Sequence, residues 1–179
     1  MKAVVFAGYS GAGKTPLIDA LIPWLKGRGL RVSVVKHAHH GFDIDYPGKD
    51  SYRHRAAGAF EVVVASAQRL ALMREFERQA PLTVHQLIAE LDGGVDWVLV
   101  EGFRDADLPK LEIWRAGQER PPLYPADPRV AALVTADPLP QATRLPVFAP
   151  ADAEAIGAWL LAQGARFDYD PARYAPGHA

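Results

Sequence analysis

The sequence predicts an α/β fold, a doubly wound and mostly parallel sheet with helices on both faces. Three observations indicate it. Short apolar runs alternate with segments of helical periodicity along most of the 179 residues. One run, Trp97 to Val100, is apolar throughout, as in strands that are buried on both faces of a parallel sheet. A glycine-rich segment joins the first strand to the first helix.

Composition points to a single soluble domain. Apolar residues make up 49% and charged residues 23%, close to ordinary globular usage. We expect one domain over residues 1–165 and a loose tail over residues 166–179, which contain Pro171 and Pro176. The lack of cysteine excludes disulfides and thiolate zinc sites and fits a cytoplasmic location. A net charge of -1 and the lack of a membrane-length apolar run argue against nucleic-acid and membrane partners.

The chain opens with a strand, a helix and a second strand. Lys2 to Gly8 is the first apolar run, and Lys14 to Arg28 has apolar residues at helical spacing. Pro16 suits the first turn of that helix because the amide that proline lacks would be unpaired there. Arg31 to Lys36 is the second strand, so the three elements form a βαβ unit and predict a parallel sheet.

The middle of the chain is less regular. Residues 37–48 are predicted as a loop and Asp50 to Ala57 as a short helix that ends at Gly58. Two β-rich runs, Phe60 to Ser66 and Arg69 to Phe76, are separated by two residues and suggest a hairpin.

The alternation of strands and helices then resumes. The elements expected there are a helix over Thr83 to Leu91, strands over Trp97 to Val100, Lys110 to Arg115, Val130 to Thr135 and Pro146 to Ala149, and a helix over Asp152 to Gln163. Residues 118–128 are rich in proline and are predicted to be irregular.

The segment from Gly8 to Thr15 matches the pattern G-x-x-x-x-G-K-[ST] at every fixed position. Its backbone amides can surround a phosphate at the helix N-terminus, Lys14 can reach the β- and γ-phosphates, and Thr15 can ligate Mg²⁺. The fold is therefore predicted to be P-loop NTPase-like, although a glycine-rich turn that binds nothing is the alternative. The predicted nucleotide-binding residues here are Gly8, Ser10, Gly11, Ala12, Gly13, Lys14, Thr15 and Pro16.

Two acidic positions are candidates for the metal. Glu101 follows the apolar strand Trp97 to Val100 and is expected at the rim of the sheet, where it would hold Mg²⁺ or orient an attacking water. Asp43 lies in the loop after the second strand and could also reach the metal. Either could instead be a solvated acid. Lys14 and Glu101 are the predicted catalytic residues, and Thr15, Glu101 and Asp43 the predicted metal ligands.

A cationic stretch follows the second strand. It is a candidate site for an anion, with zinc and a merely solvated basic helix as alternatives. Its members are Lys36, His37, His39, His40, Lys49, Arg53, His54 and Arg55.

The P-loop, the stretch from Val34 to Arg53 (VVKHAHHGFDIDYPGKDSYR) and the segment Leu99 to Arg104 (LVEGFR) together resemble the molybdopterin-guanine dinucleotide biosynthesis adapter family, MobB. The resemblance covers residues 2–137. It implies a GTP-binding homodimer with weak GTP hydrolysis, assisting a guanylyltransferase that attaches GMP to molybdopterin, and an anionic pterin is a further possible ligand. Pro16 departs from the family pattern, in which threonine or serine more often follows the P-loop.

Guanine recognition has one candidate residue. Asp137, in Thr135-Ala136-Asp137 after the Val130 to Thr135 strand, resembles the shortened guanine readers of related P-loop proteins. A carboxylate there could accept hydrogen bonds from the guanine ring N–H and exocyclic amine, a pair of donors that adenine lacks. Asp137 could instead be a turn residue before Pro138.

Two other functions use the same loop. A small P-loop kinase would need an acceptor pocket and a lid, for which residues 118–129 are long enough. A binding module with a degenerate P-loop would use it only as a scaffold. Selective binding of GTP over ATP, or phosphate transfer to a metabolite, distinguishes these functions from the adapter.

Overall fold

The computed structural model describes residues 1–38, 41–118 and 120–174, and their contacts divide the chain into two compact units. The first comprises Met1–His37 and Thr83–Ala179, and the second Ala38–Leu82. The sequence predicts a single domain over residues 1–165, whereas residues within 38–82 form a compact unit of their own. His39, His40 and Pro176, which the sequence analysis singles out, lie outside the described residues.

The first unit is built on a six-stranded sheet in the order β2-β5-β1-β6-β7-β8. Every pair of neighbouring strands in this sheet is parallel. The strands are β1 (Lys2–Ala7), β2 (Val32–Lys36), β5 (Trp97–Glu101), β6 (Lys110–Ile113), β7 (Val130–Val134) and β8 (Val147–Phe148).

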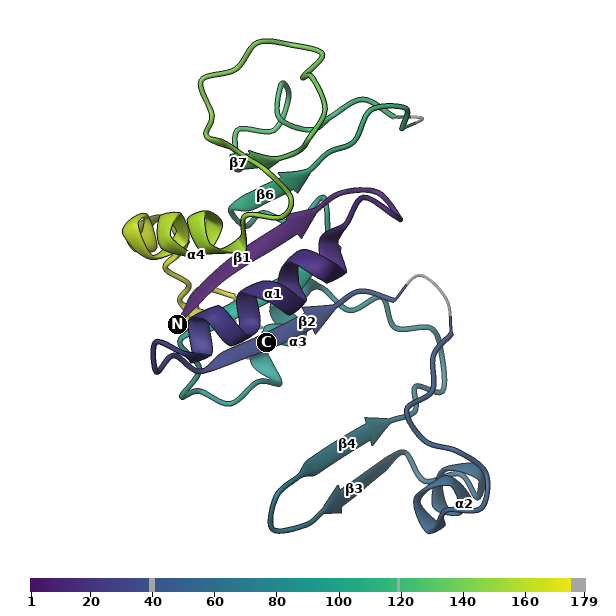
Figure 1. Ribbon diagram of the computed structural model, residues 1–179. Coiled ribbons are helices and arrows are strands. Elements are labelled where there is room, and N and C mark those ends of the chain that lie inside the picture. The colour runs from purple at the N-terminus through teal and green to yellow at the C-terminus, as the bar shows by residue number, and fades with distance from the viewer. Residues whose placement is uncertain (39–40, 119, 175–179) are drawn as a thin grey trace. The chain divides into compact units, whose positions relative to one another are not determined.

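Helices cover both faces of this sheet, as the sequence predicts. α1 (Lys14–Lys26) and α4 (Ala153–Ala162) pack on one face with Phe6 and Leu99, and α3 (Val84–Ala89) packs on the other with residues such as Val98. Figure 1 shows the strands of this unit side by side, with α1 and α4 running along them. Alternate side chains of β1 and β5 enter the two cores, because successive residues of a strand point to opposite faces. The predicted doubly wound α/β fold is confirmed.

The second unit contains α2 (Asp50–Ala56) and a separate antiparallel sheet of β3 (Glu61–Ala65) and β4 (Leu70–Arg74). The predicted hairpin therefore forms, with Ala65 opposite Leu70. Arg55 of α2 binds three carboxylates, those of Asp43, Asp45 and Glu75. This ion cluster ties the start and end of the unit to its helix.

The segment after α4 is packed over its described part. Short 3₁₀ helices occupy Gly164–Phe167 and Pro171–Arg173, and Asp168 forms an antiparallel bridge with Lys2. Phe167 and Tyr169 are buried against opposite faces of the sheet. The sequence predicts a loose tail from residue 166, but these two aromatic side chains, two residues apart, supply apolar surface to both cores.

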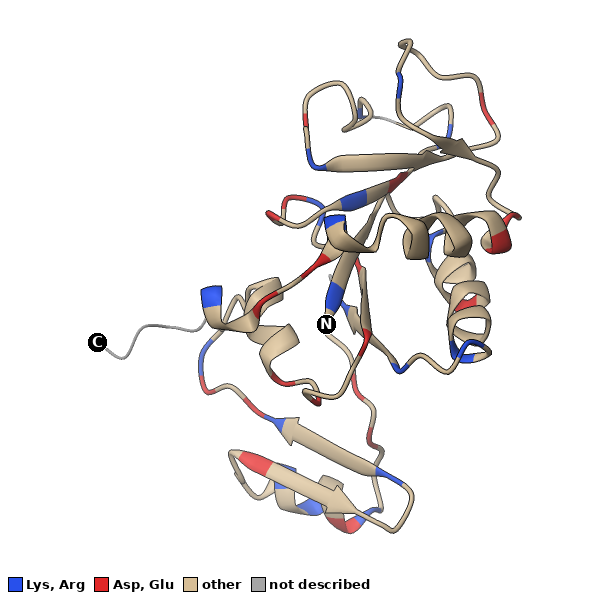
Figure 2. Cartoon of the chain, turned by 90° about the vertical axis from the view of Figure 1, so that its left-hand side faces the viewer, with Lys and Arg blue, Asp and Glu red and all other residues tan. Residues whose placement is uncertain are grey.

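Within the described residues, no helix is long and apolar enough to cross a bilayer. Figure 2 shows the strands of the sheet largely free of charged residues, most of which lie in loops, in helices or near strand ends. Three charged residues of the strands, Glu101, Lys110 and Glu112, are buried.

Candidate functional site

The predicted phosphate-binding loop lies at the carboxyl end of β1, in the middle of the sheet. β1 has β5 on one side and β6 on the other. From here α1 leads to β2 at one edge of the sheet, whereas β6, β7 and β8 continue toward the opposite edge. Ligands of open α/β sheets bind where the chain departs in opposite directions in this way.

The backbone of the loop is arranged to receive an anion. Gly13, the N-cap of α1, has a φ of 105°, a left-handed conformation that glycine adopts without strain. No side chain caps this helix end and no acid lies in its first turn. The amides and the helix dipole are therefore directed at the loop, as phosphate binding requires. Ser10 is exposed, and buried Ala12 donates its amide hydrogen to Tyr9 O at 3.1 Å.

Lys14 lies against the loop itself. Its Nζ donates hydrogen bonds to Gly8 O at 2.8 Å and Tyr9 O at 2.7 Å. Burial lowers the pKa of Lys14, although the charge of Glu101 opposes that effect. An ammonium group that is partly desolvated and held by neutral carbonyls gains from exchanging them for phosphate oxygens, because hydrogen bonds between two charged groups are stronger.

Thr15 and Glu101 are brought together, as the sequence predicts. Thr15 Oγ1 donates to Glu101 Oε1 at 2.7 Å, and the other carboxylate oxygen lies 3.2 Å from Lys36 Nζ. Glu101 is only 8% exposed, so it is not a solvated strand-end acid. A hydroxyl and a carboxylate beside a phosphate-binding loop are oxygen ligands of the kind that Mg²⁺ uses.

The part of the chain that the structure describes does not supply a complete set of metal ligands by itself. Among residues 1–38, 41–118 and 120–174, no three His, Asp or Glu side chains cluster as a metal site would need. Mg²⁺ commonly takes only one or two protein ligands and completes its shell with phosphates and water. The pair Thr15 and Glu101 fits that mode of binding, whereas the described residues give no support to zinc.

Asp43 belongs to the second unit, where its carboxylate is already engaged. It accepts hydrogen bonds from Arg55 at 2.9 Å and from the Asp45 amide at 2.9 Å. The hydrogen bond from Arg55 holds the pKa of Asp43 below its ordinary value. This arrangement gives Asp43 a structural role, and its function as a metal ligand stays a prediction.

Asp137 links two loops at the carboxyl edge of the sheet. Its Oδ2 accepts from the Ala116 amide at 2.8 Å, and its own amide donates to Thr135 Oγ1 at 3.0 Å. Ala116 follows β6 and Asp137 follows β7, and these strands are parallel neighbours. Asp137 therefore lies at the same edge of the sheet as the phosphate-binding loop, which follows β1.

The described members of the predicted cationic stretch have different partners. Lys36 pairs with Glu101, and the His37 ring contacts the Phe103 ring, with centroids 4.7 Å apart. Arg53 pairs with Asp50 at 3.6 Å, and Arg55 is committed to its three acidic partners. Lys36 thus belongs to the nucleotide site, while the anion-binding role of the second unit's basic residues stays a prediction.

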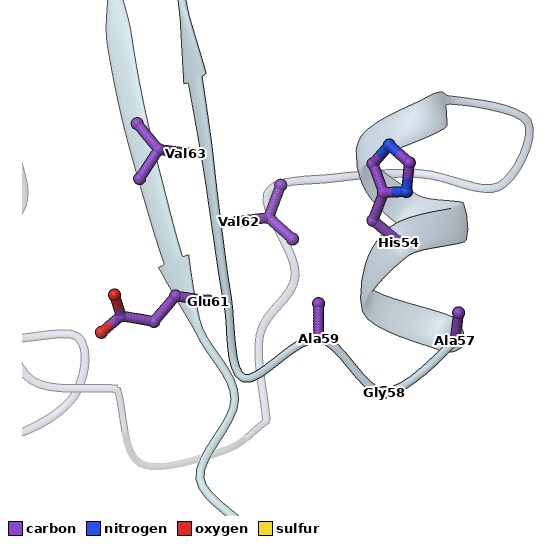
Figure 3. A pocket seen from close by; sticks show the side chains of 7 residues that line it. All are labelled: His54, Ala57, Gly58, Ala59, Glu61, Val62 and Val63. Carbon is purple, nitrogen blue, oxygen red and sulfur yellow. The ribbon is translucent and has the colours of Figure 1, made fainter.

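A shallow hollow of about 570 Å³ lies between α2 and β3 in the second unit. Figure 3 shows Val62 on the side of the strand toward α2, with Glu61 and Val63 on the other side. His54 is its one ring-bearing residue, and Glu61 pairs with Arg74. None of the predicted nucleotide-binding or metal-binding residues lines it.

Two buried charges that composition and spacing did not indicate hold the proline-rich segment in place. Glu112 accepts the amides of Leu123 at 2.6 Å and Tyr124 at 2.8 Å, and burial raises its pKa. Lys110, with no exposed surface, pairs with Asp127 at 2.8 Å. The sequence does contain a signal for Lys110 and Glu112, because both lie in a strand that is otherwise apolar. A charged residue in a strand that is buried on both faces needs a partner.

Arg104 is a further residue at the site. Its guanidinium donates to the Tyr9 hydroxyl and lies 4.7 Å from the centre of the Tyr9 ring. In the sequence it ends the segment Leu99 to Arg104, which contributes to the family resemblance, but nothing there assigns it a role at the site.

Comparison with known proteins identifies what this architecture is similar to. A family model described as MobB, molybdopterin guanine dinucleotide synthesis protein B, matches residues 3–136. The molybdopterin-guanine dinucleotide biosynthesis adapter protein of Escherichia coli is 43% identical over 138 residues, 76% of this chain and 79% of the relative. The adapter protein of Haemophilus influenzae is 42% identical over 133 residues, 74% of this chain and 73% of the relative.

Solved structures agree with the sequence relatives. A crystal structure of Bacillus subtilis MobB superposes with a TM-score of 0.69 at 26% identity, covering 95% of this chain and all of that one. A MobB homologue from Bacillus stearothermophilus gives a TM-score of 0.66 at 25% identity, over 91% of this chain and 97% of its own.

Proposed function

The chain belongs to the molybdopterin guanine dinucleotide synthesis protein B family, and from this premise we propose that it binds GTP with Mg²⁺ as an adapter in molybdopterin guanine dinucleotide biosynthesis. Its partner is the guanylyltransferase that attaches GMP to molybdopterin, and it works as a homodimer in the cytoplasm. An anionic pterin is a candidate second ligand.

One observation carries the nucleotide part of the proposal. The phosphate-binding loop, with its uncapped helix end and Lys14 poised on the loop carbonyls, adjoins the hydrogen-bonded pair of Thr15 and Glu101. Hydrogen-bond donors for phosphate and oxygen ligands for magnesium thus lie side by side at the edge of the sheet where ligands bind. Pro16 lies in the first turn of α1. Because proline has no amide hydrogen, it cannot donate a backbone hydrogen bond to a phosphate.

Each residue has a distinct task. Lys14 transfers its hydrogen bonds from Gly8 O and Tyr9 O to the outer phosphates. Thr15 and Glu101 would hold Mg²⁺, and the ion would supply positive charge to neutralise the phosphates. Lys36 stays beside Glu101 and limits the excess negative charge there. Asp137 keeps one oxygen on Ala116 and offers the other to guanine.

The same contacts support weak hydrolysis. Glu101 has one carboxylate oxygen on Thr15 and the other beside Lys36. A carboxylate whose two oxygens are already engaged is poorly placed to take the proton of an attacking water. Binding with little turnover suits an adapter whose effect is exerted on a partner enzyme.

A nucleotide titration tests this proposal. With Mg²⁺ present, we expect GTP to bind more tightly than ATP, and Lys14→Ala to weaken GTP binding by at least about tenfold, the loss of a charged hydrogen bond. Lys26→Ala, at the other end of the same helix, is the matched control. Equal affinities for GTP and ATP would contradict guanine recognition.

The adapter role needs its own assay. Guanylyl transfer to molybdopterin by the partner enzyme is measured with and without this chain, and we expect stimulation that Lys14→Ala reduces. No effect of the wild-type chain would count against the role. The relatives do not favour a small-molecule kinase, and transfer of the γ-phosphate to a metabolite would be the result that revives it.

A further inference from the structure

We propose that Arg104, held in place by Tyr9, binds the terminal phosphate and so lets the site distinguish a nucleoside triphosphate from a diphosphate. This inference rests on the proposed nucleotide binding and deepens it, since it assigns a residue that no P-loop pattern contains. The supporting observations concern the path of the chain, the contacts of Tyr9 and the charges around Arg104.

The chain after β5 turns back toward the phosphate-binding loop. Gly102 has a φ of 93° and Phe103 a φ of 47°, so two consecutive residues are left-handed. For a bulky residue such as Phe103 that conformation is strained. The contact between the rings of Phe103 and His37 accompanies this turn. A strained backbone at a site is maintained by its surroundings and frequently serves function. Its effect here is to place Arg104 on Tyr9.

Tyr9 connects Arg104 to the phosphate-binding machinery. Its ring lies under the guanidinium and its hydroxyl accepts a hydrogen bond from Arg104, while its carbonyl accepts one from Lys14 at 2.7 Å. One loop residue therefore positions both cations. Lys14 addresses the β- and γ-phosphates in this type of loop, so the neighbouring guanidinium is directed to the same outer end of the phosphate chain.

The guanidinium retains capacity for a ligand. It carries five N–H donors, and its hydrogen bond within the described residues goes to a neutral hydroxyl. Its acidic neighbour Asp105 is 3.9 Å away and 96% exposed, so that ion pair is weak. The charge of Arg104 also acts on the buried carboxyl of Glu112, where it lowers a pKa that burial raises, but no ion pair joins these two residues within the described part of the chain. The Arg104 side chain is 28% exposed, which leaves it reachable from solvent yet partly desolvated. Arginine in such a setting suits bidentate binding of phosphate oxygens.

Affinity for triphosphate and diphosphate, measured by calorimetry with Mg²⁺, tests this role. We expect Arg104→Gln to weaken GTP binding by about 10- to 100-fold, as for a charged hydrogen bond, and GDP binding by less than about threefold. Tyr9→Phe, which keeps the ring and removes the hydroxyl, should show the same GTP-specific direction with a smaller loss. Arg104→Lys should recover part of the GTP affinity because it keeps the charge without the fork.

The matched control is Arg28→Gln. Arg28 also stacks on an aromatic ring, that of Trp24 at 3.4 Å, but near the opposite end of α1. The Arg28→Gln variant should bind GTP and GDP with the affinities of the wild type. Thermal unfolding of each variant identifies any general loss of structure, and a variant of Arg104 that lost GTP and GDP equally, or neither, would overturn the inference.

The same titrations with ATP and ADP separate this inference from guanine recognition. If the wild type bound ATP as well as GTP, the guanine proposal would fail, yet the triphosphate-specific loss in Arg104→Gln would still appear with ATP. A wild-type chain that bound no nucleotide would contradict both.

Discussion

At position 8 there is no room for a side chain. A Cβ on Gly8 would lie 2.5 Å from the carbonyl oxygen of Ile113 in the neighbouring strand β6. Backbone cannot yield as a flexible side chain can, so even one methyl group must displace either β6 or the phosphate-binding loop. The first glycine of the motif therefore sets the spacing between the loop and the sheet.

We predict that Gly8→Ala lowers the free energy of unfolding by about 1–3 kcal/mol, as overpacking does, and weakens GTP binding. Gly93→Ala is the control, because a Cβ there meets nothing within 4 Å and its φ is not positive. Urea denaturation and nucleotide titration of the two variants check it. Equal stability of Gly8→Ala and the wild type would show that the loop adjusts without cost.

Substitution of Glu101 should weaken magnesium binding without weakening phosphate binding. Glu101→Gln keeps an oxygen for the Thr15 hydroxyl but removes the charge that would hold the ion. We expect the gain in GTP affinity on adding Mg²⁺ to fall by about tenfold, while affinity in EDTA changes little. Glu154→Gln, at an exposed position of α4, is the control. An unchanged magnesium effect would reduce Glu101 to a structural partner of Thr15.

Among loops and strands, the proline-rich segment depends on a buried ion pair. Burial alone raises the pKa of Asp127, but hydrogen bonds from Lys110 and the Arg129 amide bring it below its ordinary value. Removing the carboxylate charge would leave Lys110, which has no exposed surface, without its partner. Breaking a buried pair in this way is far more costly than losing an exposed one.

We predict that Asp127→Asn lowers the free energy of unfolding by about 3 kcal/mol or more. Because the folded pKa is depressed, the wild type has this contribution above pH 3.8 and loses it as the pH falls through the folded value. Asp127→Asn should lack that part of the acid dependence. Urea denaturation at several pH values measures both effects.

Asp92→Asn is the matched control for that prediction. Asp92 pairs with Arg31 at 3.4 Å, but both side chains are largely exposed. An exposed pair of this kind contributes roughly 0–1 kcal/mol, and asparagine can still accept from the Gly94 amide. A comparable loss of stability in both variants would contradict the importance of burial.

The helices and strands could be predicted from sequence patterns because the signals for them are local. The apolar run at Trp97 predicts β5 to within one residue, and Thr83 forms the cap that starts α3. The contacts of Arg104, Glu112 and Asp127 were not predictable in the same way. They depend on which strands become neighbours and on where the loops cross, and the order β5-β1-β6 is not written in any periodicity.

The same distinction applies to the residues of the candidate site, some of which have local signals in the sequence while others depend on distant contacts. Thr15 and Glu101 were paired in advance because a motif and a strand end both lead to the carboxyl edge of a parallel sheet. Asp43 was assigned to the metal by its place after the second strand, yet its carboxylate is engaged by Arg55. The aromatic pair Phe167 and Tyr169 was assigned to a loose tail because proline content outweighed a two-residue alternation.

At the scale of the whole chain, the sheet of the second unit is small and presents apolar side chains at its surface. β3 and β4 form a two-stranded sheet, which is marginally stable by itself in water. Several of its apolar side chains are exposed among the described residues, with Val63 57% exposed and Leu70 68%. Such a surface is typical of an interface, and a second copy of the same chain is the occupant that the proposed homodimer supplies.

We therefore predict that Leu70→Lys weakens self-association by at least about tenfold, because a desolvated charge is costly in an apolar contact. Leu161→Lys, which replaces an exposed leucine on α4 of the first unit, should leave association unchanged. Sedimentation equilibrium measures the dissociation constant of each variant. Nucleotide titration of Leu70→Lys shows whether the first unit binds GTP without a second copy. If Leu70→Lys stayed as dimeric as the wild type, β3 and β4 would not form the contact between copies.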